Sequence, residues 1–463
     1  MKLRENTTPI VASLIFLISF IIFLRDFSNS SKALSAKHLT IAQAAVSNFK
    51  YAATELRAAV YYPKNRTSGF SMQELLDLCH NGESLQITKE WAIRGTAESL
   101  TENYLGSCYA LEISQSQSRR SMGHCSDIIQ YVYYGNARLS VSFGQSAYES
   151  KGKLCPQTTY LHGEFFQESL LKHPRKLRNL WLPNLEQIEA SHLPLYQLAT
   201  KILCKTKITC TASQMYMDDV NIKGGATLKY MSHSSPDARE NAAELLGVDE
   251  YKRISERDDR YNRFYHAYGH SGRKSTDDLL HCWYGHPKWP KLTVVGHHNP
   301  HEFIRKKYRG IKNLPRNIEI LSSVPVKKLR ELQLSNGIHL CPSQQEGYGH
   351  YINEARAFGA LVMTTHYPPM EEFVEDGVSG VLIEHERPWP EPHQALQKYF
   401  ISPVRVSSDD ICRAVEKVMA LDLETRKEIG RHARLAYEKD TEILKENMKE
   451  LVKEAEDFLR NGE

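Results

Sequence analysis

The chain has 463 residues, which at about 150 residues per domain is enough for two large domains or three small ones. Its 59 basic and 55 acidic side chains leave a formal net charge of only +4, which argues against bulk electrostatic binding to nucleic acid. The nine cysteines show no CxxC pair and no zinc-site spacing with histidine. In an oxidising compartment, Cys204 and Cys210, or Cys108 and Cys125, are candidates for pairing.

The amino-terminal end carries a membrane signal. The run from Pro9 to Leu24 is uncharged and mostly Ile, Leu, Phe and Val, and it follows Lys2 and Arg4. Its length is at the short edge of the roughly 17–25 residues that a spanning helix needs. A cleavable signal peptide is the alternative. We expect an uncleaved type II anchor in the endoplasmic reticulum or Golgi membrane, with a cytosolic tail at 1–7, a transmembrane signal anchor at 8–24, a stem at 25–50 and the remainder of the chain in the lumen.

The first half of the remaining chain shows strands that alternate with helical segments. Asn179–Pro183, Lys201–Lys205 and Ala226–Met231 read as buried strands, and the apolar run Ile128–Tyr134 looks like another. Such alternation favours a parallel sheet with crossover helices. We therefore predict an amino-terminal Rossmann-like domain over residues 51–240, followed by a charged connecting passage over Pro236–Arg263.

A second alternation of strands and helices follows that passage. Strands are expected at Arg263–Tyr268, Lys291–Val295 and Asn317–Leu321, and helices at Thr276–Trp283 and Val326–Leu334. We predict a carboxy-terminal Rossmann-like domain over 263–421. A helical tail over 422–463 is expected to pack one apolar face on the sheet. The fold class is thus α/β, with two Rossmann-like domains and an amino-terminal transmembrane anchor.

The stretch from Cys341 to Thr365 reads as strand, glycine loop, helix and strand. A glycine loop and a helix start at the carboxyl end of a strand form an anion site from backbone N–H groups. Glu346 and Glu354 lie eight positions apart in this stretch, and carboxylates are suited to binding hydroxyl groups. A phosphorylated sugar or a nucleotide is the ligand that this combination indicates.

The same stretch carries a family resemblance. Pro342 to Gly349, followed by Asn353-Glu354-Ala355 and Gly359 to Val362, resembles the signature of retaining glycosyltransferases of the GT-B fold, group 1 type, in which two glutamates form an E-x7-E pair. Gly269 to Ser275 is similar to the phosphate loop of that family, and Glu372 to Leu382 to a later segment. The family's Gly-Gly turn is replaced by Pro368-Pro369, and proline offers no backbone N–H.

The resemblance implies that the two Rossmann-like domains face a cleft, with 51–240 as the acceptor domain and 263–421 as the donor-binding domain. It also implies roles for individual residues. Glu346 faces the transferred sugar, where a carboxylate stabilises an oxocarbenium-like transition state, and Lys274 binds the departing diphosphate. Glu354 binds the ribose hydroxyls. We expect Glu346 and Lys274 to be catalytic, no metal or other cofactor to be needed, and the donor to be bound by Glu354, Gly347, Tyr348, Gly349, Ser343, Arg273 and His270.

The predicted function is transfer of a hexose, with retention of configuration, from a nucleotide sugar to a glycan, protein or lipid acceptor. The expected partners are the nucleotide sugar, the acceptor and, through residues 8–24, a membrane, but no nucleic acid. Guanosine–mannose and uridine–glucose or N-acetylglucosamine donors are all open. The alternatives are another GT-B nucleotide-sugar enzyme, such as an epimerase or a phosphorylase-like enzyme, and a non-catalytic sugar-binding protein.

Overall fold

The computed structural model describes most of the chain after residue 109. The described residues are 76, 110–116, 122–135, 138–142, 157–163, 177–188, 192–222, 225–269, 271–296, 315–388 and 401–461. The expected tail 1–7, the anchor 8–24, the stem 25–50 and His270 lie outside this set. Among the helices of the described residues, none combines the length and apolar character that crossing a membrane requires.

The first half contains a six-stranded sheet in which every neighbouring pair of strands is parallel, in the order β2-β1-β3-β4-β5-β6. The three strands predicted near residues 180, 203 and 228 are confirmed as β4, β5 and β6. The elements are β1 (Leu111–Ser116), α4 (Met122–Gly135), β2 (Arg138–Ser142), β3 (Thr159–Gly163), β4 (Arg178–Leu182), η3 (Leu185–Gln187), α7 (Leu195–Leu198), β5 (Lys201–Cys204), α8 (Lys207–Asp219) and β6 (Thr227–Tyr230).

Apolar side chains cover both faces of this sheet, as expected for parallel strands. On β4, Leu180 and Leu182 belong to a core shared with α4, whereas Trp181 belongs to a separate core with α7 and α8. The predicted strand at Ile128–Tyr134 is wrong, because these residues lie in α4. The described side chains of α4 from Cys125 to Tyr131 are all buried, and a helix buried all round gives the same continuous apolar run as a strand.

The second half contains another six-stranded parallel sheet, in the order β12-β11-β10-β7-β8-β9. The predicted strands and helices of this half are confirmed with shifts of one or two residues at their ends. The elements are β7 (Phe264–Gly269), α11 (Thr276–Gly285), β8 (Leu292–Gly296), β9 (Ile318–Ser322), α13 (Val326–Ser335), β10 (Ile338–Cys341), α14 (His350–Ala357), β11 (Leu361–Thr365), η6 (Met370–Phe373), β12 (Val381–Ile383), and the antiparallel pair β13 (Glu386–Pro388) and β14 (Val404–Arg405).

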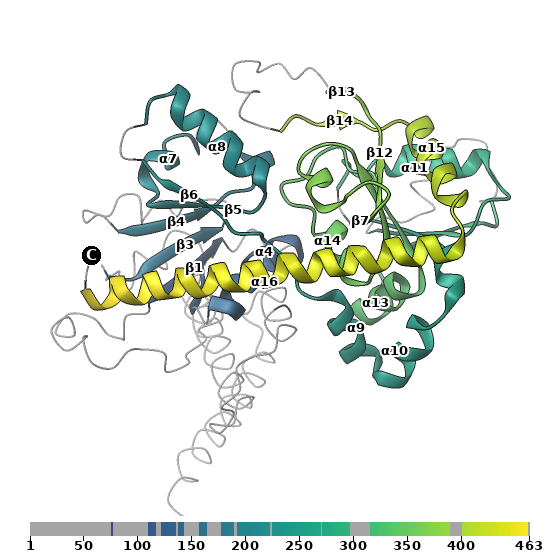
Figure 1. Cartoon of the computed structure of the whole chain (residues 1–463), viewed down its shortest axis with the longest axis horizontal. Helices are drawn as coiled ribbons and strands as arrows, with labels where there is room; N and C mark the ends of the chain where they lie inside the picture. Colours follow the sequence, from purple (N-terminus) through teal and green to yellow (C-terminus); the bar gives the residue numbers. More distant parts are fainter. Residues whose placement is uncertain are drawn as a thin grey trace, which may run out of the picture. The chain divides into compact units, whose positions relative to one another are not determined.

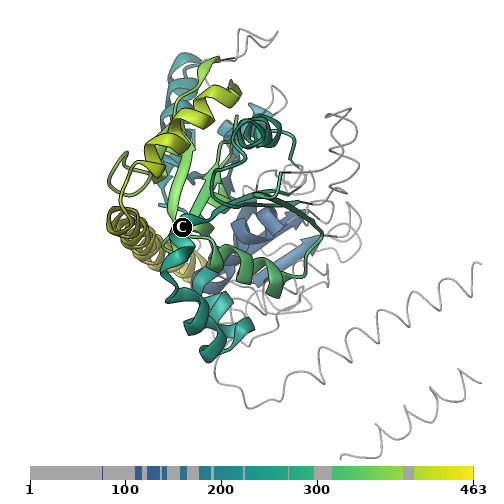
Figure 2. The same cartoon turned by 90° about the vertical axis from the view of Figure 1, so that its right-hand side faces the viewer.

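Helices cover both faces of the second sheet (Figures 1 and 2). The side chains of Ile338 and Leu340 pack in one core with α11 and α15 (Ser408–Met419). Cys341 follows Leu340 directly, so its side chain lies on the other face of the sheet, in another core with α14. This alternation follows from the two-residue period of a strand. It leaves the ends of the strands, rather than their faces, open to polar loops.

The predicted charged passage at Pro236–Arg263 is mostly helical. It forms α9 (Ala238–Leu246), α10 (Val248–Ser255) and η5 (Asp258–Asn262). Asp237 caps α9 by accepting hydrogen bonds from the N–H groups of Arg239 and Glu240. The buried residues of α9 and α10 form a core with α13 and α14, so these helices belong to the second half.

The carboxy-terminal segment is the 39-residue helix α16 (Leu423–Asn461), shown in yellow in Figure 1. A helix of this length extends about 58 Å. Ile429 near its start packs in the core of the second sheet, whereas Leu444, Met448 and Leu451 pack in the core of the first. The expected packing against a sheet is therefore found on both sheets, along one stripe of the helix.

Two disulfides join residues within the described part of the chain. Cys204 is bonded to Cys210, one of the pairings considered from the sequence, and Cys282 on α11 is bonded to Cys412 on α15. Cys341 keeps a free, buried thiol. Such cross-links persist in oxidising compartments and are rare in the cytosol of most organisms.

Candidate functional site

Two loops meet at the carboxyl ends of neighbouring strands in the second sheet. One follows β7 and contains Arg273 and Lys274, and the other follows β10 and runs from Pro342 to Gly349. The backbone N–H of Gln344 donates to the carbonyl of Arg273 at 2.8 Å. The parallel order of β7 and β10 brings these loops together, although about 70 residues separate them in the sequence.

Lys274 and Glu346 form an ion pair at this junction. Their side chains are only 14% and 12% exposed, so their charges lie in a poorly solvated environment. The hydroxyl of Ser343 also donates to Glu346, and the Lys274 ammonium lies 3.9 Å from the centre of the Tyr351 ring. The two residues proposed from the sequence as catalytic are thus in direct contact.

Glu354 lies on α14 and is held from α13. Its Oε1 is 3.1 Å from Nη1 of Arg330, and its Oε2 accepts a hydrogen bond from Gln333 at 2.8 Å. Burial acts to raise the pKa of Glu354, but the Arg330 charge and these hydrogen bonds outweigh it and leave that pKa lowered. Glu354 is therefore an ionised carboxylate with fixed orientation.

The glycine loop contacts the first half of the chain. A Cβ at Gly347 would lie 3.1 Å from Asn184, just after β4, and Gly349 has φ +98°, which a side chain disfavours. The ring of Tyr348 is buried against His233, with ring centroids 4.4 Å apart, and its hydroxyl donates to the His233 carbonyl. The loop backbone is thus shaped partly by residues of the other sheet.

The cationic side chains predicted near the donor make different contacts in the structure. Arg273 donates to the side chain of Gln345 and not to Glu346, while His270 lies outside the described residues. Lys274 is therefore the cation of the loop after β7 that contacts Glu346. Gln345 also donates to the carbonyl of Ile401, which ties the loop to the segment before β14.

Sequence reasoning missed a second set of polar residues, at the carboxyl ends of the first sheet. Lys205 directly follows β5 and is 1% exposed, and its ammonium lies 2.6 Å from Oδ2 of Asp127 on α4. The same ammonium donates to Asn184, which follows β4. Polar residues directly after predicted buried strands were the available signal, because parallel α/β sheets bind ligands at those ends.

Histidines complete this second set. Nε2 of His233, three residues after β6, and Nε2 of His350, at the start of α14, donate to Asp127 Oδ1 at 3.1 and 2.9 Å. Burial acts to raise the pKa of Asp127, but the charges of Lys205 and His350 and the two hydrogen bonds hold it well below its usual range. Burial lowers the pKa of His233 to about 4, so this imidazole is neutral near pH 7.

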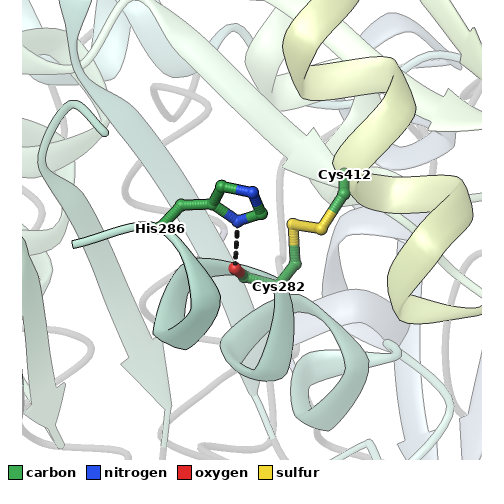
Figure 3. A group of neighbouring side chains, drawn as sticks. All are labelled: Cys282, His286 and Cys412. Carbon is green, nitrogen blue, oxygen red and sulfur yellow. Dashed lines mark hydrogen bonds between the residues drawn. A yellow bond between two sulfur atoms is a disulfide. The ribbon is translucent and has the colours of Figure 1, made fainter. Parts of the chain in front are cut away.

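Two groups of described residues have the composition of a metal site. Cys282, His286 and Cys412 form the first, but Figure 3 shows the two sulfurs joined in a disulfide, which removes the thiolates that bind a metal. Nδ1 of His286 is hydrogen-bonded to the carbonyl of Cys282 at 2.8 Å. Asp127, His233 and His350 form the second group, and there the Lys205 ammonium already balances the carboxylate.

Comparison with known proteins agrees with this geometry. Residues 286–403 match the model of the family described as Glycosyl transferases group 1, a range that contains Glu346 and Glu354. No curated protein matches the sequence significantly. The matched range contains the strands from β8 to β13 and the loop that carries Glu346.

Solved structures share the fold at low sequence identity. A glycosyltransferase from Rickettsia africae aligns with a TM-score of 0.54 at 11% identity, over 76% of this chain and 99% of that one. A trehalose-6-phosphate synthase aligns with a TM-score of 0.53 at 9% identity, over 74% and 98%. An E. coli trehalose-6-phosphate structure bound with UDP-2-fluoro glucose gives 0.52 at 9%, over 74% and 98%. These likenesses establish the fold.

Proposed function

We propose that the protein is a retaining glycosyltransferase that moves a hexose from a nucleotide-sugar donor to a glycan, protein or lipid acceptor without a metal ion. The contact between Lys274 and Glu346, at the carboxyl ends of β7 and β10, carries the proposal. It unites a phosphate-binding cation with a carboxylate in a site of low exposure, where electrostatic stabilisation is strong. That a structure of similar fold is bound with UDP-2-fluoro glucose supports a nucleotide sugar as the donor class.

In this mechanism, the Lys274 ammonium neutralises charge that develops on the leaving diphosphate. Glu346 lies beside the transferred sugar and stabilises positive charge at its anomeric carbon. The acceptor hydroxyl attacks from the face that the diphosphate leaves, and a phosphate oxygen accepts its proton. Glu354, oriented by Arg330 and Gln333, accepts hydrogen bonds from the ribose hydroxyls.

The proposal includes a lumenal setting for this chemistry, with residues 8–24 as the anchor. The disulfides Cys204–Cys210 and Cys282–Cys412 support an oxidising compartment. Extraction of the expressed full chain with alkaline carbonate tests the anchor: we expect it to stay in the membrane pellet. Release into the supernatant would refute this part of the proposal.

The test of the reaction uses the full chain in detergent with a panel of nucleotide sugars and EDTA present. We expect donor hydrolysis or transfer that is lost in Lys274→Ala and Glu354→Ala. Lys291→Ala is the matched control, because this lysine of the same half forms an exposed ion pair with Glu319, away from the loop. Binding without turnover would indicate a non-catalytic sugar-binding protein, and interconversion of the donor sugars an epimerase. Activity that requires added metal would overturn the metal-free mechanism.

A further inference from the structure

Asp127 is the centre of a buried charge network that joins four segments of the first half and the start of α14. Its Oδ1 accepts hydrogen bonds from His233 and His350, and its Oδ2 is 2.6 Å from the Lys205 ammonium. The side chains of Asp127 and Lys205 are 8% and 1% exposed. Replacing a buried ion pair with apolar residues often leaves stability unchanged or improved. Stability alone therefore does not account for these charges at the edge of the site.

One branch of the network reaches the end of the glycine loop. His350 follows Gly349 directly and is the first residue of α14. Its Nε2 donates to Asp127, and its Nδ1 is hydrogen-bonded to Ser235 Oγ at 2.7 Å. Both ring nitrogens are thus held by residues of the segments that precede the second sheet. The orientation of the ring, and with it the start of α14, depends on those partners.

The other branch reaches the beginning of the same loop. Lys205, oriented by Asp127, donates to the side-chain oxygen of Asn184. That oxygen lies 3.1 Å from the position of a Cβ at Gly347, so the loop backbone rests against Asn184. Asp127 therefore acts on the loop at two points, residue 347 and residue 350, on either side of Tyr348.

We propose that Asp127 is a positioning residue for the loop 346–350, which it holds through His350 and through the Lys205–Asn184 pair. The loop begins at Glu346, the carboxylate that the proposed function places beside the transferred sugar, and the inference rests on that function. By this route the first half sets the position of the Glu346 carboxylate, so that the donor side of the site is complete only when the first half is in contact with it. A shift of about 1 Å in such a group can cost about 100-fold in rate.

A metal ion bound by Asp127, His233 and His350 is the competing interpretation of the same residues. Charge argues against it. Asp127 and Lys205 already form a neutral pair. A divalent cation would leave two uncompensated positive charges in a buried site, which is unfavourable. We therefore assign the network to hydrogen bonding and ion pairing.

The test compares Asp127→Asn and His350→Gln with Glu450→Gln. Glu450 pairs with Lys229 across the contact between α16 and β6, is 67% exposed, and lies outside the network. We expect kcat to fall about 10- to 100-fold in both test variants, with donor KM changed less than about threefold. Backbone amides of residues 343–353 should exchange hydrogen faster, and the double variant should lose less than the product of the single losses. Glu450→Gln should match the wild type in each measurement.

The outcomes separate the inference from the proposed function. If the wild type turns over no nucleotide sugar, the proposed function fails, while faster amide exchange in the variants would still support the coupling. Unchanged exchange and unchanged kcat in both test variants would overturn the inference. So would a stoichiometric metal, detected by mass spectrometry in the wild type and lost in Asp127→Asn. If Asp127→Asn does not fold, the result for His350→Gln tests the inference alone. The side chain of His350 is only part-buried, and replacing it leaves the Lys205–Asp127 pair intact.

Discussion

The carboxyl edges of the two sheets carry their polar residues in different ways. In the second sheet they come from two short stretches: Lys274 from one, and Ser343, Glu346 and Glu354 from the other. In the first sheet, single residues from separate segments converge on Asp127. The polar residues at the carboxyl edge of the second sheet can therefore be recognised in the sequence. Those at the carboxyl edge of the first sheet come together only when its strands are assembled. In the two proposals above, the carboxyl edge of the second sheet holds the donor and that of the first sheet positions the loop at this edge.

The largest expected effect concerns the contribution of the Arg330–Glu354 ion pair, in the second half, to the free energy of unfolding. Glu354→Ala leaves the Arg330 guanidinium, whose side chain is 4% exposed, without its carboxylate. We expect the free energy of unfolding to fall by about 3 kcal/mol, because an uncompensated buried charge is costly. Urea denaturation measures this loss. The paired variant Arg330→Met with Glu354→Met should recover part of it, and a loss below about 0.5 kcal/mol in Glu354→Ala would contradict the interpretation.

Lys274→Ala tests the same edge through activity rather than stability. We expect kcat/KM for the donor to fall about 100- to 1000-fold, as for the removal of one group that stabilises developing charge. Steady-state kinetics with the best donor of the panel provides the measurement. Lys274→Arg keeps the charge but changes its geometry, so it should recover only part of the loss. A decrease below threefold in Lys274→Ala would remove this residue from the proposed mechanism.

A buried histidine in each sheet allows the pH responses of the two halves to be compared. Burial lowers the pKa of His162 on β3 and of His266 on β7 from 6.5 to about 4. The unfolded chain takes up these protons below pH 6.5, but the folded chain does so only near pH 4. Stability is therefore fully present above pH 6.5 and declines as the pH falls towards 4, by about 3 kcal/mol for each histidine.

Thermal unfolding between pH 4 and 7 checks this prediction. His162→Gln and His266→Gln should each flatten the decline, since glutamine does not titrate in this range. If both substitutions reduce the decline of stability with pH equally, the two sheets unfold as one cooperative unit. If two separate unfolding transitions appear, each histidine can be assigned to its own half. A wild-type midpoint that stays constant across this range would show the prediction to be wrong.

The smallest expected effect concerns Gly347 and Gly349, in the loop where the second half contacts the first. Gly349→Ala forces a side chain onto a backbone with φ +98° and should cost about 1–3 kcal/mol. Gly347→Ala meets Asn184 at 3.1 Å and should cost less, because Gly347 lacks the positive φ of Gly349. Gly272→Ala, in the loop after β7 where a Cβ would meet no atom within 4 Å, is the matched control and should change the free energy of unfolding by less than about 0.5 kcal/mol. Chemical denaturation ranks the three, and the reverse order would refute the account of the loop.

Much of the second half could be predicted from the sequence, because its signals are local. Strand periodicity located β7, β8, β9 and β10, and the glycine loop with its two glutamates identified the candidate donor edge. The helix α4 shows where this reasoning stops. Between Cys125 and Tyr131 the described side chains are buried on every side, so no amphipathic pattern marks this helix, and the sequence predicts a strand at Ile128–Tyr134. Asp127 was overlooked for a related reason, since a single acid beside an apolar run carries no local signal.

The sequence by itself determined the α/β class and the alternation of elements in both halves, because these depend on residue types at short spacing. The choice of Lys274 and Glu346 as candidate catalytic residues followed from the resemblance to a family. Only the tertiary structure decided that Asp127, Lys205 and His350 meet, since they come from segments as much as 223 residues apart. It also decided that α16 packs against both sheets, because a helix's apolar stripe shows which face is buried but not against what.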